Sequence, residues 1–222
     1  MHIAQILQFL EQLQQNNNRT WMEMNKSVYQ EARHTLLQAT EQLIQGIGKF
    51  DHDIAVLAPA NCIFRINRDI RFTKDKSPYK SNMGAYFAKG GKTGGYAGYY
   101  LHLQPNNQSF IAGGIYDPSP EVLKKIRQEI DYNGEKLELI VGDKRFKELF
   151  GKLQGESLQR PPKGYEANHP HIDWLKLKSF IAIHPVMDTM VAKPDFIEHT
   201  LTLFEALAPL NQFLNAALDD IE

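Results

Sequence analysis

The chain has 222 residues, of which 42% are hydrophobic and 23% are charged. This composition excludes a disordered or collagen-like chain, and the length suffices for one large domain or two small ones. The formal net charge is −1 and the pI is about 6.7, so the chain has no general attraction to nucleic acid and any such binding must be local.

Cysteine content and apolar segments indicate the compartment. Cys62 is the only cysteine, so no intrachain disulfide can form, which fits a reducing cytoplasm. The N-terminal residues lack the basic start and apolar segment of a secretory signal. No apolar stretch approaches the roughly 20 residues that a membrane span needs. We therefore expect a cytoplasmic protein without a membrane partner, and the sequence does not indicate an oligomeric state.

Two helices are predicted at the N-terminus. Apolar residues at helical spacing mark the first one: Ile3, Ile6, Leu7, Leu10 and Leu13. The three asparagines at 16–18 end it, because asparagine tolerates cap conformations. Thr20 with Glu23 predicts a capping box that opens the second helix, which ends at Gly46 or Gly48. The predicted buried side of this second helix comprises Trp21, Met24, Val28, Leu36 and Leu43.

The middle of the chain is predicted to be rich in strands. Alternation predicts a half-buried strand over residues 63–72, with these side chains facing the core: Phe64, Ile66, Ile70 and Phe72. Further strands are predicted over these ranges: 54–57, 83–88, 96–103 and 109–116. Gly113 and Gly114, inside the last of these, indicate a bulge or the close approach of another backbone or a ligand.

The second half of the chain reads mainly as helices. Residues 119–121 (Ser-Pro-Glu) supply a cap, a first-position proline and a first-turn acid, so a helix is predicted to start there. Asn133-Gly134 is predicted to turn the chain, and Asp143 to cap a short helix. The last helical region is predicted to have Pro194 in its first turn and a break or kink at Pro209.

These elements predict an α+β fold, with a mainly antiparallel central sheet and N- and C-terminal helices packed against it, in a single domain over residues 1–222. No cofactor or metal is indicated. A P-loop ending at Lys92 would need glycine at position 86, which is Tyr86. His169 and His171 flank a proline and lack a helical metal-binding context.

Functional signal concentrates in residues 63–80. This stretch holds six lysines and arginines and two aspartates, so its formal charge is +4 in a chain whose total is −1. Arginine forks match phosphate and carboxylate groups, which points to anion recognition. The candidate ligand-binding residues are Arg65, Arg68, Asp69, Arg71, Lys74, Asp75, Lys76, Tyr79 and Lys80.

Arg68 falls on the apolar side of the predicted strand, where an unpaired guanidinium is very unfavourable. It either pairs with Asp69 or Asp75, or a bulge redirects it into a pocket. Secondary candidates are the residues that could reach or cover an anion from elsewhere in the chain: Arg19, Trp21, Lys26, Gly113, Gly114, Arg160 and Lys163. The last two flank prolines on a loop that could close over a ligand.

Several motifs occur together in one order: Asn16-Asn17-Asn18-Arg19-x-Trp21, Asn25-Lys26, Phe64-Arg65-Ile66-Asn67-Arg68-Asp69-x-Arg71-Phe72, Lys74-Asp75-Lys76-Ser77-Pro78-Tyr79-Lys80 and Gly113-Gly114-Ile115-Tyr116. This set resembles a family catalogued as domain of unknown function 2461, found widely in bacteria. The resemblance runs from the first helix to the last. It implies an intracellular α+β protein and gives no activity.

Three interpretations of the basic stretch are open. It binds a small phosphate- or carboxylate-bearing ligand, in a binding protein or in an enzyme whose catalytic residues the sequence does not identify. Alternatively it binds nucleic acid, with Phe72, Tyr79 and Tyr86 as stacking side chains, which the acidic remainder of the chain disfavours. The third interpretation is an internal ion-pair network. We favour the small anionic ligand.

Overall fold

The computed structural model describes residues 2–219. Its centre is a four-stranded antiparallel sheet in the order β1-β2-β3-β4. The strands are Met83–Ala88 (β1), Gly98–Leu103 (β2), Ser109–Ile115 (β3) and Phe180–Val186 (β4). The first three form a meander, whereas β4 returns beside β3 after a helical segment. The predicted α+β class and antiparallel sheet are confirmed.

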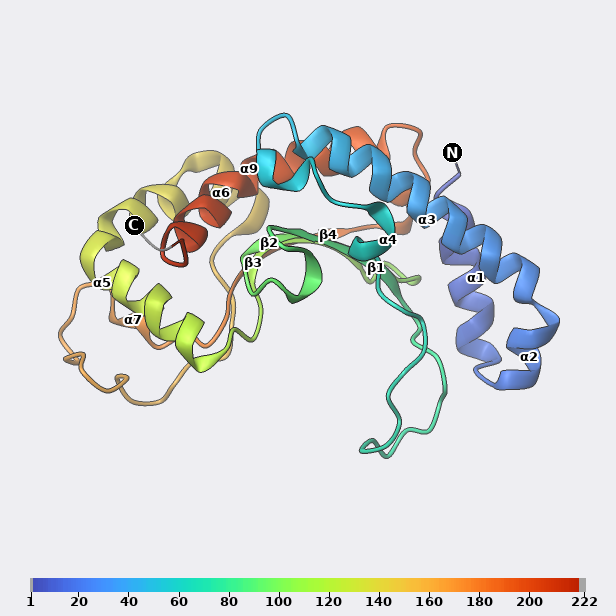
Figure 1. Cartoon of the computed structure of the whole chain (residues 1–222), viewed down its shortest axis with the longest axis horizontal. Coiled ribbons are helices and arrows are strands. Elements are labelled where there is room, and N and C mark those ends of the chain that lie inside the picture. The colour runs from blue at the N-terminus through green and yellow to red at the C-terminus, as the bar shows by residue number, and fades with distance from the viewer. Residues whose placement is uncertain (1, 220–222) are drawn as a thin grey trace.

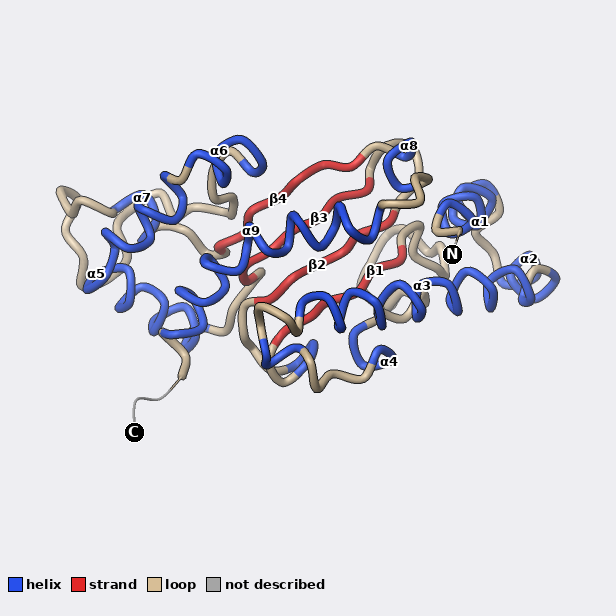
Figure 2. Tube along the Cα trace, turned by 90° about the horizontal axis from the view of Figure 1, so that it is seen from above, coloured by secondary structure: helices blue, strands red, loops and turns tan. Residues whose placement is uncertain are grey.

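Helices from both ends of the chain pack on one face of this sheet (Figure 1; Figure 2). The α-helices are Ala4–Gln15 (α1), Arg19–Met24 (α2), Lys26–Ile47 (α3), Pro59–Cys62 (α4), Pro120–Gly142 (α5), Lys144–Phe150 (α6), Ile172–Leu175 (α7), Asp188–Val191 (α8) and Phe196–Ala216 (α9). Two 3-10 turns are His52–Ile54 (η1) and Gly91–Thr93 (η2). Helices α3 and α9 run over the strands, while α1 and α2 lie at one end and α5 to α7 at the other (Figure 1). Within residues 2–219, no helix has the length and apolar character needed to cross a membrane.

The core lies between the sheet and the two long helices. Tyr99 of β2 points towards this core, with its ring 5.3 Å from that of Phe204 in α9. Its hydroxyl donates to Asp51 Oδ2 at 2.9 Å, so the buried phenol has a polar partner. Phe87 of β1 meets the same Phe204 ring at 5.9 Å. The face of the sheet that carries these rings is therefore closed by helices.

Gly113 and Gly114 are needed where α9 and β4 approach β3. A Cβ at Gly113 would lie 3.0 Å from Leu207 in α9, and one at Gly114 would lie 1.9 Å from the Phe180 carbonyl oxygen. Gly114 also has φ of +110°, and its N–H donates to Asn211 Oδ1 at 2.8 Å. The predicted close approach is confirmed: the Leu207 side chain approaches Gly113, and the β4 backbone approaches Gly114.

The predicted strand over 63–72 is wrong. Within the described residues, this stretch has only two isolated bridges, Ile63 with Ala85 and Asn67 with Tyr79. Ile66 is buried, but Phe64 is 40% exposed and Phe72 is 92% exposed. The alternation is present in the sequence, yet no strand of the part of the chain that the structure describes runs alongside to supply a ladder of hydrogen bonds. Residues 54–57, also predicted as a strand, do not form one: Ile54 ends η1, and the next two residues form a turn.

Several local predictions at helix ends also need correction. Asn18, not Thr20, caps α2 by accepting from the Trp21 N–H at 2.9 Å. Met24, expected on the buried side, is 81% exposed, and Val28 is 38% exposed. Pro194 precedes α9, and Pro209 lies inside that helix.

Two caps in the second half are confirmed and one turn is not. The Ser119 and Asp143 side chains cap α5 and α6 as predicted. Asn133-Gly134 does not turn the chain; α5 continues through a kink at Asn133. A Cβ at Gly134 would lie 2.1 Å from the His171 ring, so the glycine lets that ring pack on the helix.

We predict that Gly114→Ala destabilises the protein by about 2 kcal/mol or more, because the methyl group meets the β4 backbone at a positive φ. Gly142→Ala is the control, because among the described residues beyond its own helix a Cβ there would meet no atom closer than Lys147 Nζ at 4.0 Å. It should change stability by less than about 1 kcal/mol. Urea unfolding of both variants measures the difference. Equal effects would show that the β3–β4 contact does not require glycine.

Candidate anion-binding site

The basic loop, residues 63–82, connects α4 to β1 and projects from the edge of the sheet (Figure 1). Its first limb, residues 64–68, pairs with its second limb, residues 78–80. Arg68 N–H donates to Pro78 O at 2.9 Å, and Lys80 N–H donates to Ile66 O at 2.8 Å. The first limb is also joined to β1, where Phe64 N–H donates to Gly84 O at 3.1 Å. The loop therefore has a defined backbone path even though it is not a regular hairpin.

Asn17, in the turn between α1 and α2, fixes the second limb. Its side-chain Nδ2 donates to the Tyr79 carbonyl at 2.9 Å, and its Oδ1 accepts from the Tyr79 N–H at 3.1 Å. One amide thus satisfies both backbone groups of one residue, as a partner strand would. The sequence assigned Asn17 only a helix-ending role, and no local signal identifies a partner 62 residues away.

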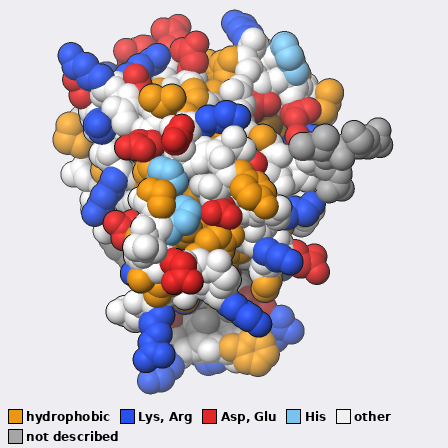
Figure 3. Space-filling view, turned by 90° about the vertical axis from the view of Figure 1, so that its left-hand side faces the viewer, with side chains coloured by type: hydrophobic (Ala, Val, Ile, Leu, Met, Phe, Trp, Pro, Cys, Tyr) orange, Lys and Arg blue, Asp and Glu red, His pale blue; other side chains and the backbone are white. Residues whose placement is uncertain are grey.

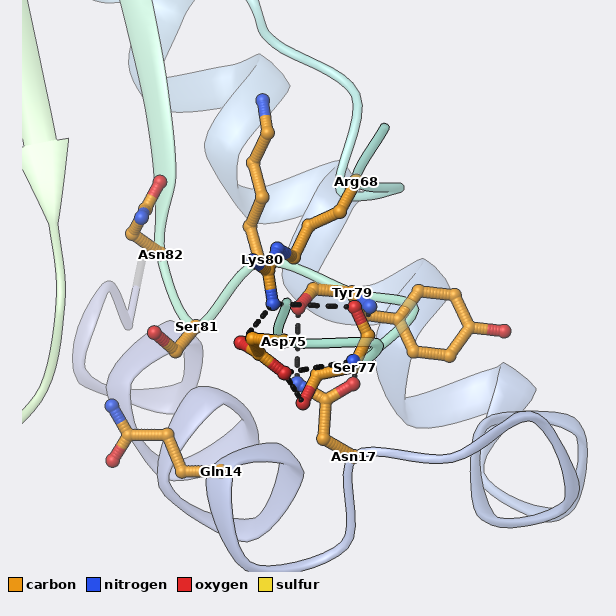
Figure 4. A pocket seen from close by; sticks show the side chains of 9 residues that line it. All are labelled: Gln14, Asn17, Arg68, Asp75, Ser77, Tyr79, Lys80, Ser81 and Asn82. Atoms are coloured by element: carbon orange, nitrogen blue, oxygen red, sulfur yellow. Dashed lines mark hydrogen bonds and ion pairs between the residues drawn. The ribbon is translucent and has the colours of Figure 1, made fainter. Parts of the chain in front are cut away.

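Between this contact and the loop is an open hollow of about 530 Å³ (Figure 4). Its lining residues all have polar side chains: Gln14, Asn17, Arg68, Asp75, Ser77, Tyr79, Lys80, Ser81 and Asn82. They come from the end of α1, from the turn after it and from the basic loop. The hollow is suited to a polar ligand, since hydroxyl, amide and cationic groups line it.

Arg68 is the central cation of the hollow. Its Nη1 donates to Asp75 Oδ2 and to the Ser77 carbonyl, the latter at 3.3 Å. The pairing that the sequence left open is therefore with Asp75. The Arg68 side chain is 24% exposed, and within the described residues its Nε and Nη2 make no hydrogen bond. Two of its three nitrogens can still donate to a ligand.

Asp75 is held as a carboxylate. Its Oδ1 accepts from the Ser77 N–H at 2.9 Å and from the Ser77 hydroxyl at 2.7 Å. These two bonds, followed by the one from Arg68, lower the pKa of Asp75 to about 2. At neutral pH, Asp75 therefore compensates the Arg68 charge from inside the hollow.

Lys80 leaves the hollow and reaches towards the sheet (Figure 4). Its Nζ lies 5.7 Å from the centre of the Phe64 ring. Partial burial, with a smaller contribution from Arg65, lowers the pKa of Lys80 from its usual value. Tyr79 contributes backbone to the hollow, since Figure 4 shows its ring directed away from Asp75.

The structure divides the predicted cluster in two. Arg68, Asp75, Tyr79 and Lys80 line the hollow. The remaining candidates lie on the loop outside it: Arg65, Asp69, Arg71, Lys74 and Lys76.

The outer residues interact mainly with each other and with solvent. Arg71 donates to both oxygens of Asp69, at 2.9 and 2.6 Å, in an exposed pair. These bonds lower the pKa of Asp69. Lys76 Nζ donates to the Ile70 carbonyl at 2.9 Å. Exposed pairs of this kind contribute little stability, so the outer group makes no preformed site.

The secondary candidates are not brought to the hollow. Trp21 packs on Phe9, with ring centres 6.2 Å apart, while Arg19 and Lys26 are exposed. Gly113 and Gly114 lie between the sheet, α9 and β4, as described above. Arg160 and Lys163 are exposed on a loop at the opposite end of the molecule from the basic loop (Figure 1).

That opposite end has histidines, but no metal site among the described residues. His169 Nε2 pairs with Asp131 Oδ1 at 3.0 Å, and the His171 ring stacks on Trp174 with centres 5.3 Å apart. No group of three or more metal-ligating side chains occurs within residues 2–219. On this face, histidines lie among acidic and hydrophobic side chains (Figure 3). The histidines therefore attach the 159–171 loop to α5.

We predict that Asn17→Ala loosens the second limb of the basic loop. Two hydrogen bonds are lost, each contributing about 1 kcal/mol net, so exchange of the Tyr79 amide should accelerate about thirtyfold. Asn16→Ala is the matched control, because the Asn16 side chain donates to Gln12 O of the helix that it caps and, among the described residues, makes no hydrogen bond to the basic loop. Hydrogen exchange followed by NMR measures both. Equal rates at Tyr79 in the two variants would contradict the role assigned to Asn17.

Comparison with family models identifies a family for this chain. The model of a family described as a conserved hypothetical protein (DUF2461) matches residues 5–213. No curated protein and no solved structure matches the chain.

Proposed function

Since the chain belongs to this DUF2461 family of conserved hypothetical proteins, whose description assigns no activity, we propose from the geometry that the hollow binds a small phosphate- or carboxylate-bearing anion. The observation that carries the proposal is Arg68, a largely enclosed guanidinium with two nitrogens facing no protein acceptor among the described residues. A guanidinium of this kind favours a bidentate oxyanion.

Asp75 supports this ligand class. Its carboxylate already occupies the hollow and accepts from Arg68, which is the interaction that a ligand carboxylate or phosphate would make. A ligand can bind beside it through Nε and Nη2, or displace it from Nη1. Side chains of Gln14 and Asn82 on the far wall supply further donors (Figure 4). The Ser77 hydroxyl donates to Asp75 Oδ1, so we assign it no catalytic role, and a reaction at this site remains a prediction.

A structural role for the network is the second candidate. Asp75 gathers bonds from Ser77 and Arg68 and so ties the tip of the loop to its first limb. Such a network could serve only to shape the loop. Nucleic-acid binding has less support. Of its three stacking candidates, Tyr79 packs against the core and the Tyr86 hydroxyl is bonded to Tyr96 O at 2.8 Å, which leaves Phe72.

We predict that Arg68→Met weakens anion binding by tenfold or more, because charged hydrogen bonds contribute about 1.5–3 kcal/mol. Arg71→Met is the matched control on the same loop. It should leave the affinity for the anion within about twofold of the wild-type value, because the interactions of an exposed charge contribute little free energy. Calorimetry with phosphate, pyrophosphate and small dicarboxylates measures both variants.

Thermal stability separates the two candidates. An anion at a hundred times its dissociation constant adds about 2.7 kcal/mol of stability to the wild-type protein. This gain should be lost in Arg68→Met and kept in Arg71→Met. If no anion stabilises the wild type and Arg68→Met melts far below it, the charges serve only as a structural network.

A further inference from the structure

The two faces of the sheet differ. Helices α3 and α9 cover one face, whereas the described chain places no helix across the other (Figure 1). On that second face, β2 presents Tyr100 and His102, and β3 presents Phe110 opposite His102. Tyr100 and Phe110 are only half-buried. Tyr100 and Phe110 thus form a partly accessible surface, and His102 beside them is buried.

These rings form one continuous row with Phe64 of the basic loop. The Phe64 ring meets the edge of Tyr100 at 6.0 Å, and Tyr100 meets Phe110 at 5.7 Å. His102 stacks on Phe110 with ring centres 4.3 Å apart, and its Nδ1 is hydrogen-bonded to the Tyr100 hydroxyl at 2.9 Å. The row is therefore supported from behind by two strands, and Phe64 is its exposed end, with 40% of its surface open.

Phe64 is held in place and is flanked by cations. Its N–H donates to Gly84 O at 3.1 Å, which fixes the residue to the edge of β1. The ammonium groups of Lys80 and Lys92 lie 5.7 and 5.5 Å from the centre of its ring. Lys92 is itself anchored, because its Nζ donates to Ile63 O at 2.5 Å. An apolar ring bordered by two positive charges suits an aromatic group attached to an anion.

Lys80 joins this aromatic end to the hollow. Lys80 lines the hollow beside Arg68, and its side chain leads away from Asp75 (Figure 4). Its ammonium lies 5.7 Å from the centre of the Phe64 ring. Lys80 therefore connects the two groups, with one part of the residue at the hollow and its ammonium at the Phe64 ring.

We infer that the ligand is an aromatic anion, such as an aryl or nucleoside phosphate, whose oxyanion binds at Arg68 and whose ring packs on Phe64. This inference rests on the proposed anion site. It adds a second subsite that selects aromatic anions over simple ones. The alternative is a structural role, in which Phe64, 40% exposed and beside two lysines, only packs the basic loop against the sheet.

The test compares inorganic phosphate with phenyl phosphate and adenosine monophosphate by calorimetry. Wild-type protein should bind the aromatic phosphates about tenfold more tightly than phosphate, as stacking on an aromatic side chain provides. Phe64→Leu should remove that preference and leave the affinity for inorganic phosphate unchanged. Phe72→Leu is the matched control, since Phe72 is on the same loop and 92% exposed, and it should keep the preference.

The outcomes separate the two proposals. Equal wild-type affinity for phosphate and the aromatic phosphates overturns the aromatic subsite and leaves the anion site standing. A preference that persists in Phe64→Leu also overturns the subsite, because the ring then binds elsewhere. If neither kind of anion binds the wild type, or if Arg68→Met binds both as well as wild type does, the anion site itself fails. The wild-type comparison needs no variant, so a poorly folding Phe64→Leu would not block the test.

Discussion

The site depends on two hydrogen bonds between the side-chain amide of one asparagine and the backbone of one residue in the basic loop. A 20-residue connection without regular structure has many conformations, and a hollow on it exists only if its path is fixed. Asn17 fixes it by binding both the N–H and the carbonyl of Tyr79. The contact couples the basic loop to the α1–α2 turn, which is why residues from α1 and from the loop face the same hollow.

The same device recurs on the other side of β1. The Asn215 side chain, near the end of α9, accepts from Ala97 N–H at 2.8 Å and donates to Ala97 O at 3.1 Å. Both connections that flank the edge strand β1 are therefore attached to helical segments by an asparagine. Edge strands expose unpaired backbone groups that invite pairing with other chains. Here two amides restrain the neighbouring connections of that strand.

Electrostatics inside the hollow are balanced rather than strongly positive. Asp75 compensates Arg68, and its lowered pKa keeps it ionised at neutral pH. An incoming anion meets a guanidinium that is partly satisfied, so specificity depends on geometry and on neighbouring surfaces more than on net charge. The exposed outer cations of the loop can attract an anion from solution, but an exposed pair such as Arg71 with Asp69 does not position it. Local alternation and cap residues predicted β1 to β3 and the starts of α5 and α6, because those signals act between neighbours in sequence. Alternation over 63–72 misled, because a strand also needs a partner at hydrogen-bonding distance, and that is a non-local condition. For the same reason, composition indicated the basic stretch and Arg68, while the Asn17–Tyr79 contact and the exposure of Phe64 required the structure.

The most direct test of this account is an NMR titration of the ¹⁵N-labelled protein with phenyl phosphate, following backbone amides and the Arg68 side-chain Nε–H. The account predicts that the perturbed signals are those of Arg68 Nε–H and of the amides of Asn17, Ser77 and residues 80–82, all of which lie at the hollow. Perturbations confined to the exposed residues 71–74, or a titration in which Arg68 Nε–H does not shift, would contradict it.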